Sequence, residues 1–504
     1  MGSPLDRYRP IVDDWTSFEA AIRRPLPTCI WTNPLRVDWE EVRDHLAEEG
    51  LNVEPVSWSR EAWRVEGFAN LTDSLGYRAG VFHLQEEVSQ LPVALMALDP
   101  TCRVLDLCAA PGGKTALIAI KLGGRGTVVA NDPSRGRQTV TRTLLDRLGL
   151  ANVSLTDRDG RDALWPDASF DRVLVDAPCS CEGTLRKHPG VEERTTESGR
   201  AYLVELQRRL LLNALRICRP GGRVVYSTCT FAPEENEAVV SDVLESMQGQ
   251  VRIAFVPVAG LRSKPGLTEW NGRRFKAEMA LAHRLWPHHG DTGGFFAVAL
   301  ERLGTHGAAA SSTPPAPPPG SVLATDPTVA PLLRVFTDRF GLDDHHLSSF
   351  RYRRSGRRFL MAFPEDHRPG LPFDPFSTGL AILRINGRTP KPTTRAAIAF
   401  GHAALRNRVL LDREQSLRFV SGLDSHPQPA GSAGITSPGW VLVAHGRITL
   451  GVGIAVPTEV PPSTDSDLGI KGSTRGSWVI ESLYPKHFAG LSRSAAAPPG
   501  SIPP

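Results

Sequence analysis

Two cysteines follow predicted strands, where their thiols could perform covalent chemistry. Cys179 lies in the segment DAPCSC, just after the apolar run 170–176. Cys229 is the last residue of the segment GRVVYSTC, which is the run 222–229. If these strands are neighbours, both thiols lie over one edge of a sheet. A thiolate that adds to C6 of a cytosine turns C5 into a nucleophile toward a sulfonium methyl group, and loss of the C5 proton then expels the thiolate.

Asp176 lies three residues before Cys179 and could assist the same chemistry. Charge that develops on the ring needs a hydrogen-bonding partner at the edge of the base. Asp176 is therefore a candidate catalytic residue. It could donate a hydrogen bond if protonated, or it could form a hydrogen bond with the cytosine amine.

The seven cysteines are an odd number spread over 504 residues, which favours reduced thiols over a disulfide framework. Zinc binding by Cys179, Cys181 and Cys229 is disfavoured because there is no C-x-x-C pair and no nearby ligand histidine. We therefore expect no metal. Free cysteine is often buried, and burial alone is expected to explain Cys29, Cys102 and Cys218.

The segment VLDLCAAPGGKT contains a loop suited to a ligand. A strand is predicted to end at 106–108, a turn to follow at 109–113, and a helix to begin near Lys114. Small residues let the backbone approach a ligand, and a helix N-terminus favours a carboxylate. A tight turn of any α/β protein is the alternative, and the G-x-G-x-x-G pattern of a dinucleotide fold is absent.

Acidic residues recur at the ends of successive predicted strands, at Asp132, Asp159 and Asp176. Ligands of open α/β sheets bind at the carboxyl ends of strands. Asp132 is placed to accept hydrogen bonds from ribose hydroxyls, and Asp159 could contact an adenine amine. Each could instead be an ordinary turn or N-cap residue, but together they favour a ligand of the adenosine type.

The alternation of strands and helices predicts an α/β domain at 101–303. Its strands are expected at 104–108, 127–132, 153–159, 170–179 and 222–229. The N-terminal region 1–100 carries helical stretches at 15–24 and 39–50. A Pro- and Ala-rich linker is predicted at 304–321 and a disordered tail at 492–504. Between them, the region 322–491 is expected to contain a helix at 331–341 and β-strands within 440–456.

Composition excludes some classes of protein. Apolar residues make up 41% and charged residues 22% of the chain, as in globular proteins. No apolar run is long enough for a membrane span and no signal peptide is apparent, so we expect no membrane partner and a cytoplasmic location.

The basic residues concentrate in one segment. Between Arg351 and Leu410 there are twelve Lys or Arg against three Asp or Glu, although the net charge of the chain is only +4. The run FRYRRSGRRF interleaves Phe350 and Tyr352 with arginines. Arginine pairs with phosphate and aromatic rings stack on unpaired bases, so RNA is the expected partner, with a solvated basic strand as the alternative.

These motifs resemble the Nop/Sun family of RNA cytosine-5 methyltransferases. LDLCAAPGGKT, VDAPCSCEGTLRKHP, GGRVVYSTCTFAPEENE and RLWPHHGDTGGFFAVAL match its signature segments in order and spacing, over about the first 303 residues. The resemblance implies a class I, Rossmann-like, S-adenosylmethionine-dependent methyltransferase domain. It departs at Cys181, where the family usually has glycine, and in the N-terminal segment, where only Asn33 matches.

The resemblance also assigns roles. It makes Cys229 the nucleophile, gives Cys179 a role in breaking down the covalent adduct, and places Arg186 and Lys187 near the RNA. The residues implied to contact S-adenosylmethionine are Cys108, Ala109, Ala110, Pro111, Gly112, Gly113, Lys114, Asp132, Asp159 and Asp176.

The C-terminal region resembles, less specifically, that of the bacterial small-subunit ribosomal RNA methyltransferase F group. The matching pieces are GWVLVAHGRITLGVGIA and WVIESLYPK. This implies a PUA-like RNA-binding module, in which Arg351, Arg353 and Arg354 are candidate RNA contacts, and it favours ribosomal RNA over transfer RNA. The rival functions are a DNA cytosine-5 methyltransferase, which would use Cys179 as nucleophile, and a non-catalytic ribosome-assembly factor.

Overall fold

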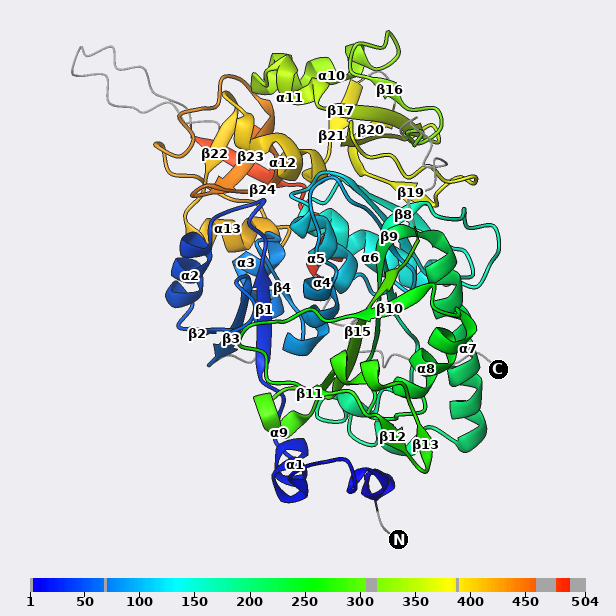
Figure 1. The fold of residues 1–504 in the computed structure, drawn as a ribbon. Helices are drawn as coiled ribbons and strands as arrows, with labels where there is room; N and C mark the ends of the chain where they lie inside the picture. Colours follow the sequence, from blue (N-terminus) through cyan, green and yellow to red (C-terminus); the bar gives the residue numbers. More distant parts are fainter. Residues whose placement is uncertain (1–2, 68–69, 305–314, 387–388, 459–476, 490–504) are drawn as a thin grey trace, which may run out of the picture.

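The computed structural model describes residues 3–67, 70–304, 315–386, 389–458 and 477–489 (Figure 1). The predicted tail 492–504 and most of the predicted linker lie outside these residues. None of the helices in the described ranges has the length and apolar character needed to span a lipid bilayer.

A ten-stranded sheet forms the centre of the molecule, in the order β11-β14-β15-β9-β8-β5-β6-β7-β19, with β10 beside β15. The strands from β9 to β7 in this order run parallel, and β15 returns antiparallel beside β9. The strands are β5 (Arg103–Asp106), β6 (Thr127–Asn131), β7 (Val153–Thr156), β8 (Phe170–Asp176), β9 (Cys218–Thr228), β10 (Val251–Ala254), β11 (Lys264–Pro265), β14 (His283–Leu285), β15 (Phe295–Arg302) and β19 (Ser377–Thr378).

Helices cover both faces of this sheet, as its apolar strands require. Separate apolar cores lie on the two faces. One is closed by α7 (Glu197–Ile217) and α8 (Glu237–Ser246), and the other by α4 (Leu91–Leu95), α5 (Gly113–Lys121) and α6 (Arg135–Leu148) (Figure 1). The predicted α/β arrangement is confirmed, with each parallel strand ending earlier than expected because the polar residues after it form loops.

Local sequence sets the helix boundaries. Ser134 caps α6 by accepting from the Arg137 N–H, and the helix ends at Gly149 in the left-handed conformation. Thr196 caps α7 by accepting from the Gly199 N–H. These helices pack their apolar faces on the sheet, which holds the carboxyl ends of the strands in fixed positions.

A four-stranded sheet, in the order β2-β3-β1-β4, precedes the central one. The elements of this N-terminal region are η1 (Pro4–Tyr8), α1 (Trp15–Ile22), β1 (Thr28–Thr32), α2 (Trp39–Glu48), β2 (Asn52–Pro55), β3 (Ala62–Glu66), η2 (Leu71–Asp73), α3 (Leu75–Arg78), β4 (Phe82–Leu84) and η3 (Glu87–Gln90). Short elements also lie between the later strands of the central sheet: η4 (Glu182–Thr184), η5 (Val191–Glu193), β12 (Glu269–Trp270), β13 (Arg273–Arg274), η6 (Ala277–Leu281) and α9 (Pro287–Gly290).

The C-terminal region contains two sheets, β16-β17-β18-β20-β21 and β22-β23-β24-β25. Its elements are β16 (Val322–Leu323), α10 (Ala330–Arg334), η7 (Val335–Arg339), α11 (Asp344–Ser348), β17 (Phe350–Ser355), β18 (Phe359–Pro364), β20 (Leu380–Asn386), β21 (Thr389–Pro392), α12 (Thr394–Phe400), η8 (Gly401–Ala403), β22 (Arg408–Leu410), α13 (Arg413–Val420), β23 (Gly439–His445), β24 (Ile448–Pro457), β25 (Trp478–Ser482) and α14 (Lys486–Ala489). The β-strands expected within 440–456 are present as β23 and β24.

The N-terminal and C-terminal regions share one apolar core. Ile30 and Phe82 of the first sheet belong to the same buried cluster as Phe419 and Val443. Tyr484 also donates a hydrogen bond to the Arg78 carbonyl at 2.6 Å. Figure 1 shows α13 of the C-terminal region lying beside α3 of the N-terminal region.

The C-terminal region also contacts the central sheet directly. Strand β19 pairs antiparallel with β7 at the edge of that sheet. The buried His367 ring lies 2.8 Å from the Ser154 hydroxyl of β7. The two ends of the chain and the central sheet are therefore joined by packing as well as by sequence.

Candidate active site

The loop between β5 and α5 forms one wall of the site. Gly112 has φ +100°, and a Cβ there would lie 2.7 Å from the Thr141 side chain of α6, so only glycine fits. Helix α5 begins at Gly113, one residue before the predicted start near Lys114. Its first N–H groups are therefore directed toward the loop.

Asp132 follows β6, as predicted, and is buried. Its carboxylate accepts from the Ser134 N–H at 2.9 Å and pairs with Arg137 at 2.9 Å. Burial raises the pKa of Asp132, while Arg137 opposes that shift. Arg137 also donates to the Ala110 carbonyl at 2.5 Å, which ties the loop to the end of β6.

Asp159 lies after β7 but is far more open than Asp132. Its carboxylate forms a two-pronged ion pair with Arg161, and hydrogen bonds from Arg161 lower the pKa of Asp159. The two predicted adenosine contacts thus differ in surroundings, because Asp132 is held in the interior and Asp159 at the surface.

Asp176 ends β8 and is held by two partners. One carboxylate oxygen lies 2.7 Å from the Lys114 ammonium, and the other accepts from the Ser227 hydroxyl at 2.7 Å. Burial opposes the charge on Lys114, but the ion pair with Asp176 raises the pKa of Lys114 overall. Both carboxylate oxygens of Asp176 therefore have a partner that donates a hydrogen bond to them.

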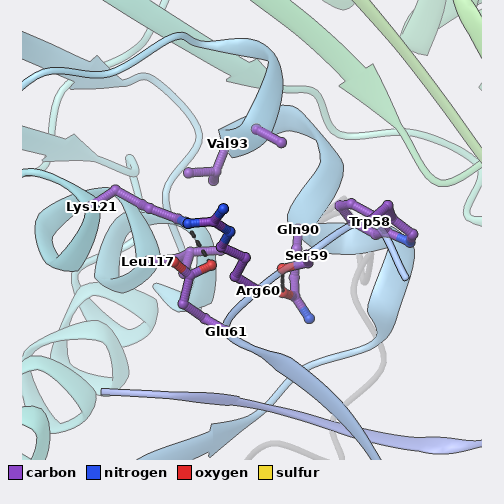
Figure 2. Close-up of a pocket in the computed structure, with 9 residues that line it drawn as sticks. Trp58, Ser59, Arg60, Glu61, Gln90, Val93, Leu117 and Lys121 are labelled. Carbon is purple, nitrogen blue, oxygen red and sulfur yellow. Dashed lines mark hydrogen bonds and ion pairs between the residues drawn. The ribbon is translucent and has the colours of Figure 1, made fainter. Parts of the chain in front are cut away.

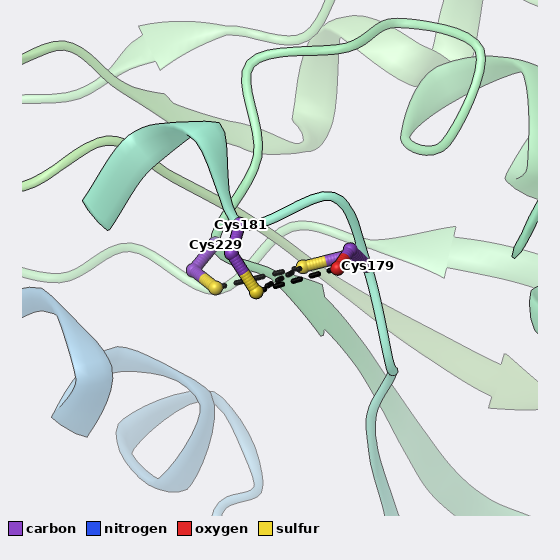
Figure 3. Close-up of side chains that lie close together, drawn as sticks. All are labelled: Cys179, Cys181 and Cys229. Atoms are coloured by element: carbon purple, nitrogen blue, oxygen red, sulfur yellow. Dashed lines mark hydrogen bonds between the residues drawn. The ribbon is translucent and has the colours of Figure 1, made fainter. Parts of the chain in front are cut away.

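Three thiols converge just beyond the ends of β8 and β9 (Figure 3). The Cys179 Sγ lies 3.5 Å from the Cys229 Sγ and 3.9 Å from the Cys181 Sγ. The two strands are parallel neighbours, with Asp176 opposite Ser227, so the predicted meeting of Cys179 and Cys229 is confirmed. Cys181 lies beside them, although the sequence assigned its side chain no catalytic role.

The buried surroundings keep these thiols protonated. Contact with Cys181 lowers the pKa of the Cys179 thiol, but contact with Cys229 and burial raise that pKa well above its ordinary value overall. Contact with Cys179 similarly favours the Cys229 thiolate, but Cys181 and burial raise the pKa of Cys229 overall. The nucleophile must therefore lose a proton as the site is used.

A buried ionic network supports the two cysteine loops, and sequence reasoning missed it. Arg200 pairs with Glu182 at 2.7 Å and with Glu235 at 2.8 Å. Glu235 accepts from the Ser180 N–H at 2.9 Å, and Tyr8 donates to Glu182. The acidic run in FAPEENE, part of one of the matching signature segments, was the available signal.

Asp106 is a second missed residue, at the base of the site. It is fully buried at the end of β5, and its carboxylate accepts from the Thr115 hydroxyl at 2.7 Å. Burial raises the pKa of Asp106 to about 7. A carboxyl group beneath the loop is a candidate functional residue on this ground.

The prediction that Arg186 contacts RNA is wrong. Its side chain is fully buried and donates to the carbonyls of Arg24, Pro25 and Thr292, and it pairs with Asp291 at 2.8 Å. All of its nitrogens are therefore used within the protein. Lys187, its neighbour, is exposed and stays a candidate.

The expectation that the aromatic rings of FRYRRSGRRF stack on bases is also wrong for Tyr352. That ring is fully buried, and its hydroxyl donates to the Leu347 carbonyl at 2.7 Å. Alternation along β17 puts Tyr352 in the core. Phe350 packs edge-on against Phe400, whereas Arg354 is exposed.

The other cysteine expectations hold. Cys29, Cys102 and Cys218 are buried and free, and burial raises the pKa of each thiol. A separate hollow of about 180 Å³ lies beside α5, lined by Trp58, Arg60, Glu61 and Lys121 among others (Figure 2). None of the predicted site residues lines it, and the ion pair between Lys121 and Glu61 closes part of it.

The covered parallel sheet, the small-residue loop and the strand-end acids and thiols define a Rossmann-like methyltransferase. Residues 93–301 match the family model described as "16S rRNA methyltransferase RsmB/F". The chain is 33% identical over 301 residues to a "tRNA (cytosine(49)-C(5))-methyltransferase" of Pyrococcus abyssi, an alignment that covers 59% of this chain and 95% of the relative.

A second relative extends into the C-terminal region. The "Ribosomal RNA small subunit methyltransferase F" of Erwinia tasmaniensis is 30% identical over 441 residues, covering 84% of this chain and 87% of the relative. The crystal structure of a "Methyltransferase Homolog Protein" from Pyrococcus horikoshii is 32% identical, with a TM-score of 0.53 over 59% of this chain and 94% of that one. The chain belongs to the RsmB/F family of RNA methyltransferases.

Proposed function

We propose that this protein transfers a methyl group from S-adenosylmethionine to C5 of a cytosine in RNA, with Cys229 as the covalent nucleophile. The observation that carries the proposal is the pair of thiols 3.5 Å apart at the ends of the parallel neighbours β8 and β9. Such a pair suits a reaction in which one sulfur attacks the ring and the other helps to release it.

The residues around the loop have the chemistry that S-adenosylmethionine needs. Asp132 is a buried carboxylate suited to the ribose hydroxyls, and the N-terminus of α5 suits a carboxylate. Asp159 is assigned to the adenine amine, and the remaining wall is the segment from Cys108 to Lys114. When bound, the cofactor supplies an electrophilic methyl group.

Three side chains of the protein act on the cytosine ring, each with a separate role. The Cys229 thiol first loses its proton to solvent, and Lys114 lies close enough to favour the resulting thiolate, whose Sγ then bonds to C6 of the cytosine. Asp176, positioned by its contact with Lys114, accepts a hydrogen bond from the cytosine amine. After methylation, the Cys179 thiol loses its own proton to solvent, and the resulting thiolate takes the C5 proton. The C5–H electrons then form the C5–C6 double bond, the C6–S bond breaks, and Cys229 leaves as the thiolate.

Ribosomal RNA is the favoured substrate. The relative named for the small ribosomal subunit aligns over 84% of this chain, whereas the relative named for tRNA aligns over 59%. The C-terminal region carries the basic segment, and we assign it a PUA-like, RNA-binding role. Arg351, Arg353 and Arg354 are its candidate contacts. Lys187 of the catalytic domain and the N-terminal region are further candidates.

The test offers the full-length protein and methyl-labelled S-adenosylmethionine to small-subunit ribosomal RNA, assembled small subunits, transfer RNA and duplex DNA. We expect label in the ribosomal RNA or the subunits, and bisulfite sequencing places it on one cytosine. Label in transfer RNA alone would correct the substrate, label in DNA alone would reject the RNA assignment, and no transfer to any of them would favour a non-catalytic assembly factor.

A further inference from the structure

Cys181 adds a third sulfur to the site in a position that does not favour a side chain. Its φ is +59°, in the left-handed region where glycine is the usual residue. The side chain is nevertheless buried against Cys179, and the proposed methyl transfer does not use it. A non-glycine residue held in this conformation beside reactive groups points to a use for its side chain.

The three sulfurs have the spacing of metal ligands. The Sγ–Sγ distances from Cys179 are 3.5 and 3.9 Å, and all three sulfurs lie within 4.8 Å of one another. Tetrahedral zinc–thiolate bonds of about 2.3 Å place neighbouring sulfurs about 3.8 Å apart. The trio therefore needs only small shifts to surround one ion.

The charges nearby accommodate a cation. Glu235 lies beneath the Cys179–Cys181 loop and neutralises Arg200 at 2.8 Å, and Lys114 is already paired with Asp176, so both neighbouring cations are balanced by a carboxylate. A second cluster in the described residues, Asp13 with His288 and His289, already holds the Lys264 ammonium at 2.8 Å. The sulfur cluster is thus the stronger candidate of the two.

We propose that Cys179, Cys181 and Cys229 together bind one soft divalent cation of the zinc class, and that the bound ion blocks the Cys229 nucleophile. Each thiol releases its proton as a metal–sulfur bond forms, and water takes the fourth position, so no oxidant or reductant is involved. Binding depends only on the three thiols. The inhibition rests on the proposed methyl transfer.

The experiment titrates Cd²⁺, a spectroscopic substitute for Zn²⁺, into the reduced full-length protein and follows the ultraviolet cadmium–thiolate absorption. Cys181→Gly suits the backbone at this position, and Cys181→Ser keeps the size of the side chain. Cys102→Ser is the matched control, because a serine there keeps the hydrogen bond to Asp99. Methylation is then measured with and without Zn²⁺, each variant against its own metal-free rate.

We expect one ion per wild-type chain, affinity reduced more than about tenfold by either Cys181 variant, and no change for Cys102→Ser. Zn²⁺ should inhibit the wild type strongly and Cys181→Gly much less. Wild-type affinity in both Cys181 variants, or no thiolate band in the wild type, overturns the proposal. A band in a protein that methylates no substrate leaves the metal site standing and rejects only the proposed function.

Discussion

The ends of β8 and β9 and the basic strand β17 both carry residues that the sequence marked as functional, and the structure holds them differently. At the strand ends, Asp176 and Cys179 have defined partners within 3.5 Å. On β17, Arg354 is exposed while its neighbour Tyr352 supports the core. Bond making needs groups fixed to a fraction of an ångström, whereas phosphate binding needs surface charge.

The largest expected effect is at the strand ends. Cys229→Ala should abolish both methylation and any covalent RNA adduct. Cys179→Ala should still attack and methylate, so that a protein–RNA species dependent on S-adenosylmethionine survives denaturing electrophoresis. An adduct with Cys229→Ala but not with Cys179→Ala would reverse the two roles and favour the DNA-type mechanism.

Arg186 and Lys187, which follow β8, allow a buried cation to be compared with an exposed one. Arg186→Ala should lower the free energy of unfolding by about 3–5 kcal/mol, because it leaves several buried carbonyls unpaired. Lys187→Ala should leave stability within about 0.5 kcal/mol and weaken RNA binding. Denaturant titration and RNA-binding assays on both variants measure this, and equal stability of the two would contradict the buried role of Arg186.

Asp132→Ala should weaken S-adenosylmethionine binding by about 1.5–3 kcal/mol, since it removes a charged hydrogen-bond acceptor. Calorimetry on the purified protein provides the measurement. Asp167→Ala, an exposed carboxylate paired with Arg216 before β8, is the control. Unchanged affinity in Asp132→Ala rejects its role at the ribose.

The exposed arginines of the β17–β18 turn should affect RNA binding without affecting the fold. Replacing Arg354, Arg357 and Arg358 together by alanine should reduce the dependence of RNA affinity on salt by about 0.7 per lost phosphate contact. The unfolding midpoint should barely move. An unchanged salt slope would count against this surface as an RNA contact.

The smallest effect concerns the contact between the C-terminal region and β7. Burial lowers the pKa of His367 from its ordinary value to about 3. Between these two pKa values, the histidine is protonated in the unfolded chain and neutral in the folded chain. Stability from this group is present above pH 6.5 and is lost as the pH falls toward 3. His367→Gln should flatten that acid-side loss in thermal unfolding measured across pH, and an identical profile would contradict it.

The central sheet was predictable because its signals are local. Buried parallel strands have continuous apolar runs, and the loop at Gly112 needs small residues whatever lies elsewhere. The meeting of Cys179 and Cys229 followed from strand ends sharing one edge. These inferences needed no knowledge of distant contacts.

The remainder depends on contacts between distant parts of the chain. Arg186 looked like a surface cation because its partners, near Arg24 and Asp291, are more than a hundred residues away. Tyr352 looked like a stacking residue because its core lies against the far end of α11. Cys181 was grouped with Cys179 and Cys229 only as a disfavoured zinc site, because the left-handed backbone that turns its side chain toward Cys179 is not visible in the sequence.

The core shared by the two ends of the chain has a consequence for biosynthesis. The first sheet is made early, yet Ile30 and Phe82 find their apolar partners only when Phe419 and Val443 have been synthesised. Until residues 377–378 have been made, the edge of β7 also lacks its partner β19. We expect a nascent chain with an open strand edge and exposed apolar surface during this interval, which makes it a client for chaperones.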